Sequence, residues 1–145
     1  MSRLSVDQMT GKELSDFIDQ QVADLKSSSE QLGLTSVERR DLAVFLRFHL
    51  NRENRDFVMR CTYHENGHHP VPSITFVNPE SLADERGKNW PVDRSGALKG
   101  THNPPFVCLP GVYEYHHQFH AGVQPLRKHL SLVNTVADII GCLAK

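Results

Sequence analysis

The sequence has no long hydrophobic run, no excess of one charge and no strongly basic segment. Its apolar stretches are far shorter than the roughly 18 residues that a membrane span needs. The 16 basic and 17 acidic residues give a formal net charge of −1, whereas a dedicated nucleic-acid binder usually carries a basic surface. The N-terminal segment contains early acidic residues and no apolar core, unlike a secretory signal peptide. We therefore expect a cytoplasmic protein that binds neither nucleic acid nor membrane.

Cysteine is scarce and unpaired in the sequence. Cys61, Cys108 and Cys142 lie far apart and form no CxxC motif, which argues against a structural zinc site built from closely spaced thiolates. An odd number of cysteines in a chain without an export signal also argues against a disulfide framework. Because a free cysteine is most often a small buried apolar residue, each thiol must be judged by its neighbours.

What is present is the composition of a globular protein. The 145 residues are 39% hydrophobic and 23% charged, which is typical of soluble domains. Domains most often contain roughly 100–150 residues, and neither an internal repeat nor a change of composition divides this chain. We expect one domain over residues 1–145.

A helix is expected near the N-terminus. Thr10 and Glu13 have the spacing of a capping box, and apolar residues then recur at helical intervals. This pattern predicts a helix over residues 11–26. The polar stretch 26–30, with its three consecutive serines, predicts a linker after that helix.

The middle of the chain has the pattern of strands. Residues 42–50 and 57–63 are rich in β-branched and aromatic side chains and flank a polar turn, which predicts a hairpin. Residues 73–77 alternate between apolar and polar, and predict a third strand. Pro70 and Pro72 exclude a helix before that strand and favour an extended backbone. Together the three strands predict an antiparallel meander.

The last third combines a long loop with a final helix. Glycines and prolines throughout residues 78–105 predict a long loop with little regular structure, for which Trp90 is the expected packing anchor. A short apolar segment, 106–109, follows. Pro125 is suited to the first turn of a helix, and that helix is apolar on two faces, so we expect it to be mostly buried. The order of elements predicts an α+β fold.

Cys108 is the thiol best placed for chemistry. It ends the long loop and precedes a Pro-Gly break, in the kind of segment where functional residues concentrate. His102 and Asn103 precede it, while His116 and His117 follow. A nearby imidazole can increase the thiolate fraction or move a proton, and an Asn amide can donate to an oxyanion. The pattern predicts a nucleophilic cysteine, and a packed strand cysteine is the alternative.

The histidines also permit a metal site. Three-residue or four-residue spacing on a helix can direct two imidazoles at one ion. Two groups meet this condition in part: His64, His68 and His69, and His116, His117 and His120. The first spans an expected turn and the second lacks a carboxylate at ligand spacing, so histidines on a loop surface are the ordinary interpretation. We expect no metal or cofactor.

Two segments resemble the ubiquitin-conjugating enzyme (UBC) fold family. Residues 69–77, His-Pro-Val-Pro-Ser-Ile-Thr-Phe-Val, are similar to the family's Tyr-Pro-x-x-Pro-Pro-x-Val-x-Phe segment. Residues 106–109, Phe-Val-Cys-Leu, are similar to its active-site motif. The continuation to Tyr113 resembles bacterial members, in which Cys-Leu is soon followed by Pro-Gly. The order of elements over residues 11–145 also resembles this family, with an N-terminal helix, a β-meander, a long active-site loop and a C-terminal helix.

The sequence departs from the family at two places. The eukaryotic members carry His-Pro-Asn several residues before the cysteine, whereas this chain has His102-Asn103-Pro104 in a different order and nearer to Cys108. The resemblance therefore transfers the family's asparagine role, support of the oxyanion or loop, to Asn103. The second proline before the third strand is displaced to Pro72.

The resemblance implies a cysteine acyltransferase. An activating enzyme would transfer a ubiquitin-like protein to Cys108 as a thioester, and an amine of a target protein would then attack it. His102, His116 and His117 are the candidate bases. The bacterial likeness implies a small antiviral conjugation system in the cytoplasm. A histidine-rich metal-binding protein and a non-catalytic binding module of the same fold are the alternatives, and the Cys-Leu context of Cys108 argues against the second.

Overall fold

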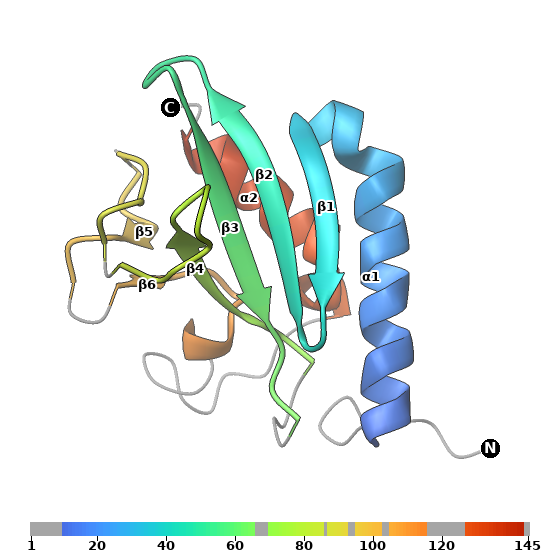
Figure 1. The fold of residues 1–145 in the computed structure, drawn as a ribbon. Coiled ribbons are helices and arrows are strands. Elements are labelled where there is room, and N and C mark those ends of the chain that lie inside the picture. Colours follow the sequence, from blue (N-terminus) through green and yellow to red (C-terminus); the bar gives the residue numbers. More distant parts are fainter. Residues whose placement is uncertain are drawn as a thin grey trace.

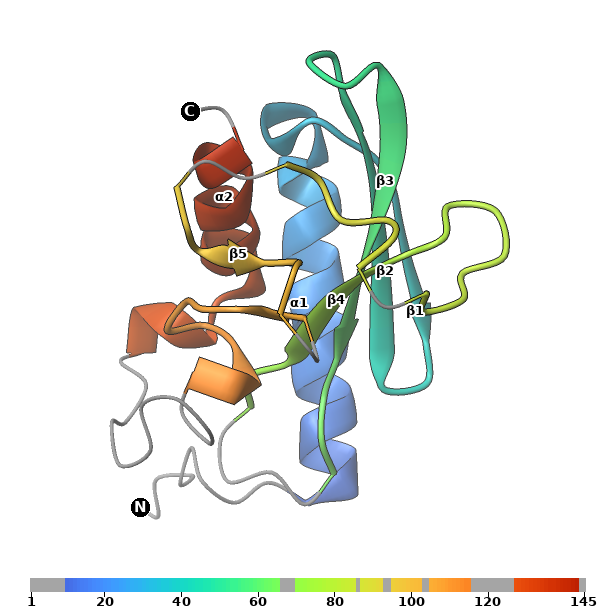
Figure 2. The same cartoon turned by 90° about the vertical axis from the view of Figure 1, so that its left-hand side faces the viewer.

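A computed structural model describes residues 10–65, 70–85, 87–92, 95–102, 105–115 and 127–143. The chain begins with helix α1 (Gly11–Leu32) and ends with the 3-10 turn η2 (Arg127–Leu130) and helix α2 (Leu132–Leu143). Between them lies a four-stranded antiparallel sheet, followed by a small two-stranded ladder. In Figures 1 and 2 both helices lie on the same side of the sheet. The expected α+β class, with a helix at each end of the chain, is confirmed.

The sheet contains one strand more than the sequence predicted. Its strands, in spatial order, are β1 (Leu34–Arg40), β2 (Ala43–Leu50), β3 (Arg55–Thr62) and β4 (Ser73–Val77). The meander β2–β3–β4 is confirmed, with pairs such as Val44 opposite Cys61 and Cys61 opposite Ile74. Sequence analysis missed β1 because this strand forms the sheet edge and exposes charged residues such as Glu38 and Arg40. Charged side chains on an edge strand also discourage pairing with other chains.

Helix α1 begins as predicted but ends later. The Thr10 side chain accepts the Glu13 N–H, and the Glu13 carboxylate accepts the Thr10 N–H, so the capping box is present. The expected linker at 26–30 is wrong, because the helix continues to Leu32 and ends at Gly33, whose φ is 75°. The serines do not stop the helix because Leu32, which follows them, packs against the core. Glycine suits the left-handed C-cap because it has no Cβ.

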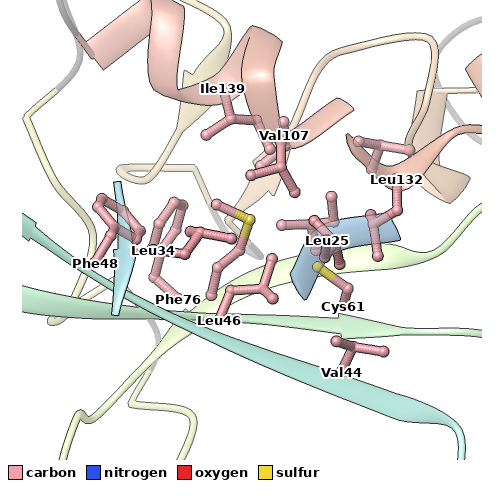
Figure 3. Packing of buried hydrophobic residues seen from close by; sticks show 14 of the residues in the cluster. Leu25, Leu34, Val44, Leu46, Phe48, Cys61, Phe76, Val107, Leu132 and Ile139 are labelled. Carbon is pink, nitrogen blue, oxygen red and sulfur yellow. The ribbon is translucent and has the colours of Figure 1, made fainter. Parts of the chain in front are cut away.

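The core lies between the helices and the inner face of the sheet (Figure 3). Successive residues of a strand point to opposite faces, and the alternation in β2 buries Val44, Leu46 and Phe48. Aromatic rings join neighbouring strands, since Phe57 lies 5.8 Å from Phe48 and 6.5 Å from Phe76 between ring centroids. No helix in the described ranges is both long and apolar enough to cross a membrane.

Only one face of α2 is buried, which corrects the expectation of two. The buried stripe includes Leu132, Val136, Ile139 and Leu143, whereas Val133 and Ile140 are half-buried and Ala137 is exposed. The helix covers the core as a single outer layer, so its opposite face has no partner among the described elements. Pro125, the expected start of the helix, lies outside the described residues. Ser131 instead precedes α2, and its Oγ accepts the Asn134 N–H at 3.2 Å.

A buried glutamine joins the two helices. Gln21, which is only 7% exposed, accepts the backbone N–H of Leu132 through its Oε1 at 2.8 Å. The first N–H groups of a helix have no partner within the helix, so a side chain of α1 satisfies the first donor of α2.

The substitution Gln21→Met is expected to destabilise the protein by about 1–3 kcal/mol, because it leaves a buried N–H without an acceptor at nearly constant side-chain volume. Urea unfolding measures this change. Gln20→Met is the matched control, because Gln20 is exposed and bonds only to Asp24. Equal losses in the two variants would contradict the assigned role of Gln21.

Candidate functional site

Cys108 lies directly after a short buried strand. Strand β6 (Phe106–Val107) pairs with β5 (Leu98–Lys99) in an antiparallel ladder that lies beyond β4 in Figure 1. The Cys108 N–H donates to the Ala97 carbonyl at 2.8 Å, so its backbone extends the ladder by one residue. Phe106 and Val107 are buried while Cys108 is half-exposed. The fold therefore places this thiol at the boundary between a packed ladder and the surface.

The long loop before Cys108 is anchored by Trp90. The Trp90 ring is 7% exposed and meets the Phe76 ring edge to face at 4.9 Å between centroids. The chain also passes close to Trp90 at Gly100, where an added Cβ would lie 3.0 Å from the Trp90 Cβ. The predicted role of Trp90 as packing anchor is confirmed. The predicted lack of regular structure over 78–105 is nearly correct, since the described part of that range contains only β5.

The chain after Cys108 is held against α2. A tight turn forms where the Val112 N–H donates to the Leu109 carbonyl at 3.0 Å. Within that turn, Gly111 contacts α2 so closely that an added Cβ would lie 1.9 Å from the Thr135 Oγ1. Val112 is completely buried. Packing therefore restrains the segment on the C-terminal side of the thiol as well.

A polar network joins the next residues to the sheet. Residues 113–115 form a short helical turn beside the start of β4, coloured orange in Figure 2. The Ser73 hydroxyl donates to the Glu114 carboxylate at 2.7 Å, and the His64 Nε2 lies 2.7 Å from the same hydroxyl oxygen. The His64 ring also stacks on Tyr113 at 3.8 Å between centroids. We call these three polar residues the His64–Ser73–Glu114 network.

Two effects act on the pKa of His64. Partial burial lowers it, because an imidazolium ion loses solvation there, and the Glu114 carboxylate raises it by a smaller amount. The result is a pKa below the ordinary histidine value, so the neutral ring predominates near pH 7. A neutral ring that donates from Nε2 to the Ser73 oxygen is consistent with the Ser73 hydroxyl donating to Glu114.

The other two cysteines have different surroundings. Cys61 is completely buried in β3, and burial raises its pKa to about 12. Cys61 therefore belongs to the hydrophobic core, as a free cysteine most often does. Cys142 lies half-buried on α2 and packs against the edge of the core. A reagent in solution can therefore reach Cys108 and Cys142 far more readily than Cys61.

The predicted helpers of Cys108 fall mostly beyond the described part of the chain. Asn103, His116 and His117 all lie outside the described residues, so their positions stay predictions. His102 is exposed in the connection between β5 and β6, where its ring meets the Phe106 ring edge to face at 5.5 Å. No hydrogen bond joins the His102 ring to Cys108, although both residues are described. His102 therefore lies beside Phe106, the first residue of the strand that precedes Cys108.

The metal interpretation receives no support from the residues that the structure covers. In those ranges no three His, Cys, Asp or Glu residues are grouped as metal ligands would be. His64 instead contacts Ser73. The remaining members of the two histidine groups lie outside the described residues: His68, His69, His116, His117 and His120.

A separate groove lies on the outer face of the sheet. It encloses about 170 Å³ and is lined by Ser36, Glu38, Arg40, Phe45, Arg47, Val58, Pro79, Glu80 and Leu82. Arg47 closes one side by donating to the Pro79 carbonyl at 2.5 Å. The groove includes Pro79, Glu80 and Leu82 from the start of the long loop, but no residue of the β5–β6 ladder or of the turn after Cys108, so it is distinct from the thiol site.

Sequence reasoning missed Ser73 and Glu114. Ser73 was recognised only as the start of a strand, and Glu114 only as part of the segment after Pro-Gly. Their hydrogen bond joins residues 41 positions apart, and no local pattern in the sequence indicates such a pair. His64 was considered only as a member of a histidine group.

Comparison with known proteins does not assign the chain. No protein-family model matches it, and no curated protein matches it either. Any function must therefore be argued from the chain's own residues and from the resemblance of its short motifs.

Proposed function

We propose that this chain is a ubiquitin-conjugating-like enzyme with a UBC-like fold. It accepts a ubiquitin-like protein from an activating enzyme as a thioester on Cys108, and then transfers it to an amine. The observation that carries the proposal is the position of Cys108. This half-exposed thiol directly follows a buried strand at the end of a long, anchored loop. The same thiol belongs to the Cys-Leu-Pro-Gly segment that resembles bacterial members of the family.

The surroundings of Cys108 suit an acyl carrier. The ladder holds its backbone through the Ala97 carbonyl, and the buried Val107 and Val112 restrain the chain on both sides. A thioester must be presented to a large acyl donor and then to an amine, so a rigid, accessible sulfur is preferable to a deep pocket. Positioning supplies much of the rate enhancement in such a reaction because the thioester is already reactive.

The proposed chemistry consists of two acyl transfers. In the first, the Cys108 thiolate attacks the carbonyl carbon of the activated C-terminus and displaces the sulfur of the activating enzyme. In the second, a neutral amine attacks the Cys108 thioester, the C–S bond breaks and an amide forms. The amine loses a proton to a base, for which His102, His116 and His117 are the proposed candidates, and Cys108 leaves as a thiolate. Asn103 is the proposed oxyanion donor.

The proposed partners are therefore proteins. They are a ubiquitin-like protein, its activating enzyme and a target that supplies the amine. We place the reaction in the cytoplasm, within a bacterial antiviral conjugation system, because of the resemblance to bacterial members. The formal charge of −1 is consistent with protein partners rather than nucleic acid.

Reconstitution tests this function directly. The protein is mixed with ATP, a cognate activating enzyme and its ubiquitin-like protein, and the products are separated on a non-reducing gel. We expect an adduct of this chain that requires ATP and disappears on treatment with a thiol. Failure to form it while the activating enzyme itself becomes charged would contradict the proposal.

A further inference from the structure

We propose that His64, Ser73 and Glu114 are positioning residues for Cys108. Their network attaches the 113–115 turn to the sheet and thereby sets the position of the thiol when an acyl group leaves it. The effect on acyl transfer rests on the proposed function. The attachment itself can be tested without that function.

The network connects three separate segments. His64 follows the end of β3, Ser73 is the first residue of β4, and Glu114 belongs to the turn after Cys108. Ser73 lies at the centre, since its hydroxyl contacts both the imidazole and the carboxylate at 2.7 Å. A third connection runs through the backbone, where the Tyr113 N–H donates to the Pro72 carbonyl at 2.8 Å. Removal of the Ser73 hydroxyl would break two of these contacts at once.

The turn is close enough to Cys108 to affect it. The hydrogen bond from Val112 to Leu109 brings their Cα atoms within about 7 Å, so the Cα atoms of Cys108 and Tyr113 are at most about 15 Å apart. The intervening chain has little freedom, because Gly111 contacts Thr135 and Val112 is completely buried. A shift of the turn must therefore change the backbone close to the thiol. Displacements near 1 Å are sufficient to reduce the rate of a positioned reaction.

The network also has a defined response to pH. Within the described residues, the groups that face His64 are the Ser73 hydroxyl, the Tyr113 ring and the Glu114 carboxylate, and Glu65 is its charged neighbour in the chain. Because the pKa of His64 is lowered in the folded protein, folding favours the neutral ring. The contribution of the neutral ring is complete above the ordinary value of 6.5 and declines as the pH falls through the lowered pKa. The network should therefore weaken in mild acid.

Discharge of the thioester tests the positioning role. Charged protein is separated from the activating enzyme and mixed with free lysine, and the loss of the adduct is followed over time. We expect Ser73→Ala to become charged to the same extent but to discharge about tenfold more slowly. His49→Gln is the matched control, because His49 forms an exposed pair with Asp56 at 2.8 Å and has no contact with the network. Equal discharge rates for Ser73→Ala and the unsubstituted protein would overturn the inference.

The pH profile separates positioning from a loss of folding. His64→Gln retains a side-chain donor for Ser73 but cannot titrate, so at pH 7.5 it should discharge at nearly the unsubstituted rate. As the pH is lowered to 5.5, the unsubstituted protein should lose more of its discharge rate than His64→Gln loses. The ratio of the two rates removes the common effect of lysine protonation. A ratio that is constant with pH would exclude His64 titration from the mechanism.

Alkylation tests the attachment independently of conjugation. In a Cys142→Ala background, Cys108 is the accessible thiol because Cys61 is completely buried. We expect Ser73→Ala to increase the rate at which N-ethylmaleimide modifies Cys108, and His49→Gln to leave it unchanged. If the unsubstituted protein forms no adduct with a ubiquitin-like protein, the proposed function is wrong and this rate alone decides the network's role. An unchanged alkylation rate would then overturn that role.

Discussion

Replacement of Cys108 by alanine is expected to abolish the thiol-sensitive adduct completely. The reaction requires a sulfur nucleophile, and no other cysteine has the same combination of exposure and backbone support. Cys61 is completely buried, and its pKa of about 12 leaves almost no thiolate at pH 7. Gel analysis of Cys108→Ala in the reconstituted reaction measures the loss.

Cys142→Ala is the matched control for this substitution. Cys142 is also half-exposed, but it lies on α2 rather than at the end of the β5–β6 ladder. We expect Cys142→Ala to form the adduct normally. Cys108→Ser adds a second readout, because an ester to oxygen should resist the thiol treatment that removes the native adduct. Survival of a thiol-sensitive adduct in Cys108→Ala would show that the site is wrongly assigned.

The substitution Gly111→Ala is expected to destabilise the protein by about 3 kcal/mol, the upper part of the range for overpacking a tight interior. An added Cβ would lie 1.9 Å from the Thr135 Oγ1 and 3.0 Å from the Thr135 Cβ. The Thr135 side chain cannot move away easily, because Thr135 is a buried residue of α2. Urea unfolding measures the loss of stability.

Two further variants make this prediction specific. Gly141→Ala lies on α2 with nothing within 4 Å of an added Cβ, so it should be neutral or stabilise by up to about 1 kcal/mol. Combining Gly111→Ala with Thr135→Ala should recover part of the stability, because the nearest clashing atom is removed while the Thr135 Cβ position remains occupied. Equal stability of Gly111→Ala and Gly141→Ala would contradict the close packing of the loop on α2.

The sequence predicted those elements whose patterns are local. The Thr10–Glu13 capping box indicated where α1 begins, β-branched and aromatic residues indicated β2 and β3, and alternation indicated β4. It did not predict that α1 continues through its serines, because the packing of Leu32 against the core outweighs their weak helix preference. Strand β1 was also missed, because an exposed edge strand carries charges that hide the strand pattern.

The candidate site was predictable only in part. The position of Cys108 at the end of a loop followed from the prolines and glycines around it. The contacts of Ser73 with Glu114, and of Gly111 with Thr135, depend on how distant segments fold together. Such contacts have no local signature, because the partners are chosen by the three-dimensional arrangement and not by spacing along the chain.

The contact between Gly111 and α2 has a consequence for biosynthesis. Ribosomes make the chain from the N-terminus, so the sheet and the thiol segment emerge before Leu132–Leu143. Until that last helix emerges, Gly111 lacks its contact with Thr135, and Val107 lacks the Ile139 side chain that lies beside it in Figure 3. The segment after Cys108 therefore gains its support from α2 only after the helix has formed. Nascent chains that stall before Leu132 would carry Cys108 without the support of that helix.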